Sequence, residues 1–152
     1  MLLQQQLAAL LGKSISQICP NGYTGQSQSA HFVAHVLGLR VGATCQMLSH
    51  GRVPGVTVRV HEIFGRCPSV GVWSLRPVTL NRCLVFVTRA PHVNLAAKTM
   101  AVVPHHAHVG LFIDGFVWHY SKRQRKVLKQ TVGELAAHYP MVGNAMFYGT
   151  LP

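Results

Sequence analysis

The chain has 152 residues, 49% of them hydrophobic, and its 14 Lys and Arg against 3 Asp and Glu give a formal net charge of +11. This length predicts one domain, residues 1–152, with a single core, and the charge predicts anionic partners. The chain has only three carboxylates, Glu62, Asp114 and Glu134. This number disfavours a glycosidase, which needs a pair of opposed carboxylates, and a two-metal nuclease, which needs carboxylate ligands. Catalysis by a nucleophile and a histidine needs no carboxylate and stays open.

The N-terminus shows no targeting segment. No apolar run approaches the roughly 20 residues that span a bilayer, and MLLQQQ lacks the basic region and long apolar stretch of a secretory signal. We therefore expect a protein made in the cytoplasm, without membrane association, that requires separate delivery to act elsewhere.

In chain order, helices come first and strands later. Residues 2–11 predict a short helix, and a second is predicted from the cap at Ser27 to the stop at Gly38. Ser29 lies in the first turn of this second helix, on the stripe of Phe32 and Val33. Strands are predicted at Val56–Val60 (which also suits a helix), Val72–Leu75, Cys83–Thr88, Ala107–Ile113, Phe116–Ser121 and Ala145–Thr150. Thr131-x-x-Glu134 is a capping box that predicts a last helix through His138. This order indicates an α+β fold.

The segment from His108 to His119 predicts a β-hairpin with two histidines on one face. Its apolar residues alternate, and Asp114-Gly115 favours a two-residue type I′ turn. The resulting register makes His108 and His119 diagonal neighbours on adjacent strands, with a backbone separation of about 7–8 Å. Gly110 faces His119 and has no side chain to separate the two rings. The pair is suited to act as a base and the group that orients it, although half-exposed strand histidines without a function are the plainer alternative.

The cysteines and the other histidines argue against a metal or cofactor. Cys19, Cys45, Cys67 and Cys83 form no C-x-x-C pair, which disfavours structural zinc but leaves the disulfide state open. Within the His105-His106-Ala107-His108 run, strand alternation lets only His106 and His108 converge. We therefore expect no metal ligands and no cofactor.

Several of these segments together resemble one family. The helix SAHFVAHVLG from Ser29, the segment Gly42-Ala-Thr-Cys45 and the strand pair HVG and WHYS resemble the papain-like cell-wall amidases and endopeptidases of the NlpC/CHAP superfamily, especially small bacterial amidase effectors. The resemblance runs from about residue 21 to residue 120. It implies a papain-like domain in which helices pack on an antiparallel sheet, with the nucleophile at Ser29, the base at His108 and the orienting residue at His119.

The chain departs from this family at the nucleophile, which is cysteine there and serine here. A helix N-terminus and a nearby histidine can lower the pKa of a thiol into the thiolate range, but an alcohol is far too weak an acid. Ser29 could therefore be a Cys-to-Ser replacement that silences the enzyme, a natural serine variant, or the mark of a binding-only descendant. The first is favoured, because the rest of the expected site still suits catalysis. Cys45 is a less favoured nucleophile, because it follows the helix rather than opening it.

The surroundings of the expected site suggest how a substrate would bind. Backbone N–H groups at the start of the Ser29 helix, with Tyr23, are candidate oxyanion donors. Trp118 and the basic residues Lys122 and Arg123 are candidate substrate contacts. The basic run 122–126 also suits nucleic acid, but no recognisable nucleic-acid module accompanies it.

The most favoured function is hydrolysis of an amide bond in peptidoglycan peptide stems. The resemblance implies a monomer without a cofactor, delivered to the periplasm or cell wall by a secretion system, and an acidic immunity protein as a possible partner. A non-catalytic wall-binding or interaction domain on the same fold is the main alternative. A basic nucleic-acid binder is a weaker one.

Overall fold

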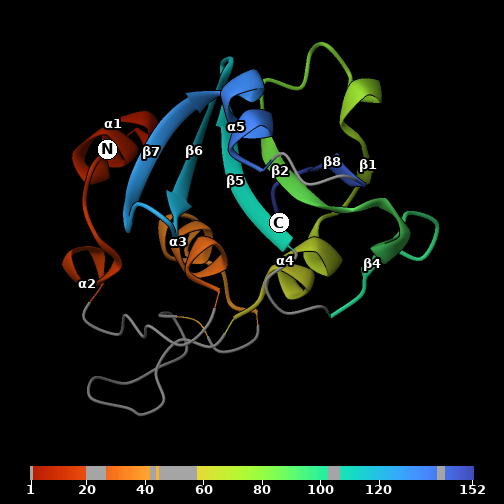
Figure 1. The fold of residues 1–152 in the computed structure, drawn as a ribbon, viewed down its shortest axis with the longest axis horizontal. Helices are drawn as coiled ribbons and strands as arrows, with labels where there is room; N and C mark the ends of the chain where they lie inside the picture. Colours follow the sequence, from red (N-terminus) through yellow and green to blue (C-terminus); the bar gives the residue numbers. More distant parts are fainter. Residues whose placement is uncertain (1, 20–26, 42–43, 45–57, 103–106, 140–142) are drawn as a thin grey trace.

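The computed structural model describes residues 2–19, 27–41, 44, 58–102, 107–139 and 143–152. It has an α+β fold in which a six-stranded antiparallel sheet, ordered β1-β8-β2-β5-β6-β7, carries helices on both faces (Figure 1). The helices are α1 (Leu3–Leu10), α2 (Ile15–Ile18), α3 (Gln28–Leu37), α4 (Val60–Arg66) and α5 (Val132–His138). The sheet strands are β1 (Val70–Val72), β2 (Arg82–Arg89), β5 (Ala107–Ile113), β6 (Phe116–Ser121), β7 (Lys126–Thr131) and β8 (Asn144–Gly149). Strands β3 (Val93–Asn94) and β4 (Thr99–Met100) form a small second sheet.

The sheet separates two apolar cores. Helices α1 to α4 cover one face, and their buried residues pack with Val109, Leu111 and Trp118 of β5 and β6. Helix α5 covers the other face, where Leu135 packs with Phe112 and Val117 of the same two strands. Because side chains alternate along a strand, neighbouring residues of β5 and β6 serve different cores. We call these the α3 face and the α5 face.

Helix α3 begins and ends at the residues that the sequence predicts. The Ser27 hydroxyl accepts a hydrogen bond from the Ala30 N–H at 3.4 Å, and Gly38 closes the helix with a φ of 64°. Phe32 and Val33 are fully buried in the α3 face. The predicted helix is therefore confirmed.

The hairpin between β5 and β6 has the predicted register. Ile113 pairs with Phe116, and Leu111 pairs with Trp118. Asp114 and Gly115 both have positive φ, 48° and 95°, as a type I′ turn requires. The capping box is also present, because Glu134 N–H donates to the Thr131 hydroxyl at 3.1 Å and Thr131 N–H donates to the Glu134 carboxylate at 3.0 Å.

Two of the predicted strands differ from the structure, and in the first the helix that the sequence also allowed is the one formed. In the described part of Val56–Val60, Val60 opens helix α4, because the Glu62 carboxylate caps the Arg59 N–H at 2.9 Å and Val60, Ile63 and Phe64 are buried at helical spacing. Of Val72–Leu75, only Val72 belongs to a strand. Residues 73–75 form a 3₁₀ turn that packs the Trp73 ring edge-on against Phe112, with ring centroids 5.0 Å apart.

The sequence reading did not predict β7, which follows the basic run. Residues 122–125 form the turn between β6 and β7, and the alternation of buried Val127 with exposed Lys126 is that of an edge strand. Within the described ranges, no helix has the length and apolar character to span a bilayer.

Candidate active site

Two imidazoles meet on the α5 face of the sheet, as the hairpin register predicts. His108 Nε2 lies 2.9 Å from His119 Nδ1, and the rings are nearly perpendicular. His119 is fully buried and His108 is 7% exposed. Gly110 makes this contact possible, because a Cβ there would lie 3.1 Å from His119 Cβ and 2.6 Å from Val117 Cγ1. The glycine that the sequence reading placed beside His119 is therefore required for close approach.

A third polar residue sets the protonation pattern of the pair. His119 Nε2 lies 2.7 Å from Gln130 Oε1 on β7. An amide oxygen only accepts, so His119 carries its proton on Nε2 and Nδ1 accepts from His108 Nε2–H. Nδ1 of a neutral His108 is then the unprotonated nitrogen. The Gln130–His119–His108 chain thus leaves a lone pair on His108 Nδ1, as a general base requires.

Helix α5 brings a phenol to this nitrogen. The Tyr139 hydroxyl lies 3.1 Å from His108 Nδ1 and 3.2 Å from Nε2, and the ring centroids are 4.4 Å apart. His138 lies on the same side of the sheet, with its Nε2 3.3 Å from the buried Ser121 hydroxyl. Sequence reasoning missed Gln130, Tyr139 and His138 as neighbours of the pair. The capping box predicted α5 but carried no information on which sheet face the helix covers.

Burial keeps both imidazoles neutral. It lowers the pKa of His108 well below its usual range, and the neighbouring His119 adds to the effect. The pKa of His119 falls to about 4 through burial, against the raising effect of its hydrogen bond to Gln130. Burial also raises the pKa of Tyr139, which therefore stays protonated. The cluster is a set of neutral donors and acceptors at neutral pH.

Ser29 lies in the first turn of α3 and is buried. Helix α3 packs on β5 and β6, the strands that carry the two imidazoles, but through the opposite sheet face. The Ser29 hydroxyl lies 3.4 Å from the Ser27 hydroxyl, and no hydrogen bond among the described residues joins it to His108 or His119. A side chain at position 29 could meet His108 only past the strand end where β5 begins, because His108 is the second residue of β5. The structure therefore joins the two histidines directly and does not join the serine to them.

The expected substrate contacts divide into buried and exposed residues. Trp118 is 4% exposed and belongs to the core of the α3 face, so its indole is not placed to touch a substrate from solvent. Lys122 and Arg123 are exposed in the turn after β6. Burial lowers the pKa of His138, and the positive charge of Arg123 adds to the effect. Tyr23, Cys45, His105 and His106 lie outside the described residues.

The structure gathers one group of side chains that could hold a metal ion, among the residues it describes. The ligand atoms of Cys19, His31 and His35 lie within 4.8 Å of one another. The sequence predicts no metal ligands, because it has no C-x-x-C pair and only two of the histidines in the run 105–108 can converge. The signal that this prediction missed was His31-x-x-x-His35, two imidazoles one helical turn apart. Cys67 and Cys83 are buried free thiols whose pKa values burial raises to about 12 and about 11.

Comparison of the chain with protein-family models, curated proteins and solved structures finds no match. The functional assignment therefore depends on the residues of this chain.

Proposed function

We propose that this chain is a papain-like hydrolase that cleaves an amide bond in peptidoglycan peptide stems. In this proposal His108 is the general base, His119 and Gln130 orient it, and residue 29 is the nucleophile position. The observation that carries the proposal is the hydrogen-bonded chain from Gln130 through His119 to His108, which leaves His108 Nδ1 unprotonated.

The chemistry is acyl transfer in two steps. His108 Nδ1 takes the proton of the nucleophile as its oxygen or sulfur bonds to the substrate carbonyl carbon. The C–N bond then breaks, and His108 returns the proton to the leaving amine. Water, deprotonated by the same nitrogen, releases the acyl group. Backbone N–H groups at the start of α3, with Tyr23, are the proposed oxyanion donors.

Residue 29 must reach His108 Nδ1 for this chemistry, around the strand end where β5 begins, because α3 packs on the opposite face of the sheet. The Tyr139 hydroxyl now lies 3.1 Å from that nitrogen, so the productive state requires the hydroxyl to move aside or to pass the proton on. A cysteine at position 29 would need less help, because a thiol ionises far more readily than an alcohol. We therefore propose that the serine form is weakly active or inactive.

The substrate class follows from charge and from the family resemblance. A net charge of +11 favours an anionic polymer, and peptide stems and wall polymers carry carboxylates or phosphates. The exposed Lys122 and Arg123 are the proposed contacts. The same surface suits an acidic immunity protein, and the target places the site of action in the periplasm or at the wall, reached through a secretion system as a monomer.

The decisive experiment compares residue 29 variants on purified peptidoglycan. S29C should release new amine termini identifiable by mass spectrometry, while S29A should release none. H108A in the S29C background is the matched control and should abolish cleavage. Absence of new termini with folded S29C protein would remove the hydrolase proposal, and unchanged cleavage by the double variant would remove His108 as the base.

A non-catalytic wall-binding domain is the second candidate. It is favoured by the Ser29 hydroxyl, which bonds to Ser27, and by the Tyr139 hydroxyl, which occupies the approach to His108. This reading predicts retention on insoluble peptidoglycan by the unaltered protein, weakened by salt and by a K122Q/R123Q double variant. Equal or tighter retention on RNA or DNA at matched salt would favour a nucleic-acid binder instead.

A further inference from the structure

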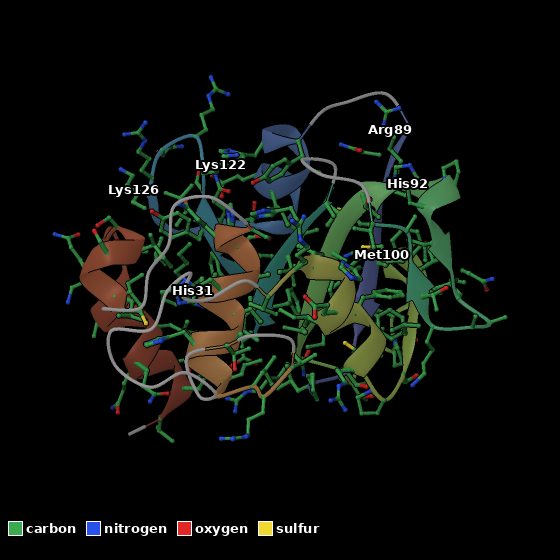
Figure 2. All side chains as sticks on the ribbon, turned by 90° about the horizontal axis from the view of Figure 1, so that it is seen from below. His31, Arg89, His92, Met100, Lys122 and Lys126 are labelled. Carbon is green, nitrogen blue, oxygen red and sulfur yellow. The ribbon has the colours of Figure 1, made fainter. Side chains whose placement is uncertain are left out.

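The junction between α2 and α3 combines three ligand-type side chains from two elements. Cys19 ends α2, where its N–H donates to the Ile15 carbonyl at 3.0 Å. His31 and His35 lie one turn apart on α3, with ring centroids 6.2 Å apart. Figure 2 shows His31 between α3 and the N-terminal helices. The Cys19 sulfur thus lies close to two imidazoles that come 12 and 16 positions later in the sequence.

We infer that Cys19, His31 and His35 form a zinc-binding site. Their ligand atoms all lie within 4.8 Å of one another. Tetrahedral Zn²⁺ with bonds of about 2.0–2.3 Å holds its ligand atoms roughly 3.3–3.7 Å apart. His31 and His35 already share a helix face, so the site requires the ligand atoms to move together by about 1 Å.

The donor set and its surroundings select the metal. A thiolate with two imidazoles suits zinc and other borderline or soft ions, whereas Mg²⁺ and Ca²⁺ require oxygen ligands. Cys19 is 2% exposed and His31 is 3% exposed, so two of the three ligands are already removed from water.

Three protein ligands leave one position of the tetrahedron for water or a further ligand. The ion would tie the end of α2 to the first two turns of α3. Since His31 follows Ser29 by two residues, the ion would also hold the start of the helix that carries the proposed nucleophile position. The inference does not depend on hydrolase activity, because its test reads metal binding directly.

The test uses untagged full-length protein, freed of metal with a chelator and kept reduced. Titration with Co²⁺ should give one equivalent of binding, with the intense near-ultraviolet band of a cobalt–thiolate bond and the visible bands of a tetrahedral ion. Zn²⁺ should displace Co²⁺ with the same stoichiometry and raise the melting temperature. Purified protein that has not been chelated should contain zinc by elemental analysis.

Variants assign the ligands. C19S should remove the cobalt–thiolate band. H35Q should weaken Zn²⁺ binding more than tenfold, because the loss of a residue that only supports a ligand already costs about 10-fold. H61Q, inside α4, and C67S, at the C-terminal end of α4, are the matched controls. Both should bind Zn²⁺ as the unaltered protein does. His35 is only half-buried, so H35Q tests the site even if C19S does not fold. Wild-type binding by both ligand variants, or absence of one-equivalent binding, would overturn the inference.

Discussion

The two faces of the sheet are built from the same strands but differ in chemistry. On the α3 face, Val109, Leu111 and Trp118 pack against four helices in an apolar core. On the α5 face, a smaller apolar core adjoins a chain of polar groups that includes His108 and His119. One face can therefore supply most of the stability while the other holds fixed donors and acceptors.

The largest effect is expected from a truncation in the α3 face. Phe32 is fully buried between α3 and the sheet, so F32A should lower the free energy of unfolding by about 3–5 kcal/mol. Urea unfolding at neutral pH measures the loss. F116A is the control, because Phe116 is 40% exposed, and its loss should be much smaller. Similar losses in the two variants would contradict the assignment of stability to this face.

Closing the gap at Gly110 should disturb the α5 face. A Cβ there meets Val117 Cγ1 at 2.6 Å, so G110A should cost about 1–3 kcal/mol through overpacking. It should also shift the NMR signals of the His119 ring. The control is G133A, whose nearest neighbouring atom is 4.0 Å away and which lies in helix α5. Equal stability and an unmoved His119 ring in G110A would show that close approach is not required.

Acid should weaken the α5 face, and the buried His31 of α3, whose pKa is also lowered to about 4, adds a contribution of the same sign. The pKa values of His108 and His119 lie below those of the unfolded chain, so the unfolded chain binds more protons and stability falls as pH falls from about 6.5 to about 4. Each such histidine contributes up to about 1.4 kcal/mol per pH unit. Urea unfolding across this range, with a chelator present, measures the slope. H119Q should have a shallower slope, and an unchanged slope would exclude His119 as a source.

The smallest effect is expected at the cap of α5. T131A removes the acceptor of the Glu134 N–H and should cost about 1 kcal/mol. Because α5 carries Tyr139 to His108, hydrogen exchange at its first turn should also rise. T79A, at an exposed threonine in a loop, is the control for the substitution itself. A cap variant as stable as T79A would mean that packing alone holds α5 in place.

Local patterns predicted the hairpin but not what surrounds it. Strand alternation and the Asp114-Gly115 turn specify which residues share a face, and the contact between His108 and His119 follows from them. The partners Gln130 and Tyr139 come from β7 and α5, whose positions depend on packing across the sheet rather than on any spacing. For the same reason the reading could place Ser29 on a buried stripe but not on the face opposite the two imidazoles.

The metal cluster shows a similar limit. The helical spacing of His31 and His35 is visible in the sequence, but Cys19 joins them only through the way α2 meets α3. At Val60 a local signal was sufficient. Its apolar neighbours suit a strand or a helix, and the hydrogen bond from the Arg59 N–H to the Glu62 carboxylate caps the helix that forms.

The backbone of β7 also has a partner outside the sheet. Gly12 N–H donates to the Val127 carbonyl, and Val127 N–H donates to the Lys13 carbonyl, both at 3.0 Å. The stretch after α1 thus occupies hydrogen-bonding groups that an outermost strand would otherwise offer to another molecule. Removing the first 13 residues would expose the backbone groups of Val127. We expect the truncated chain to self-associate through this strand, which the residues after α1 prevent in the full chain.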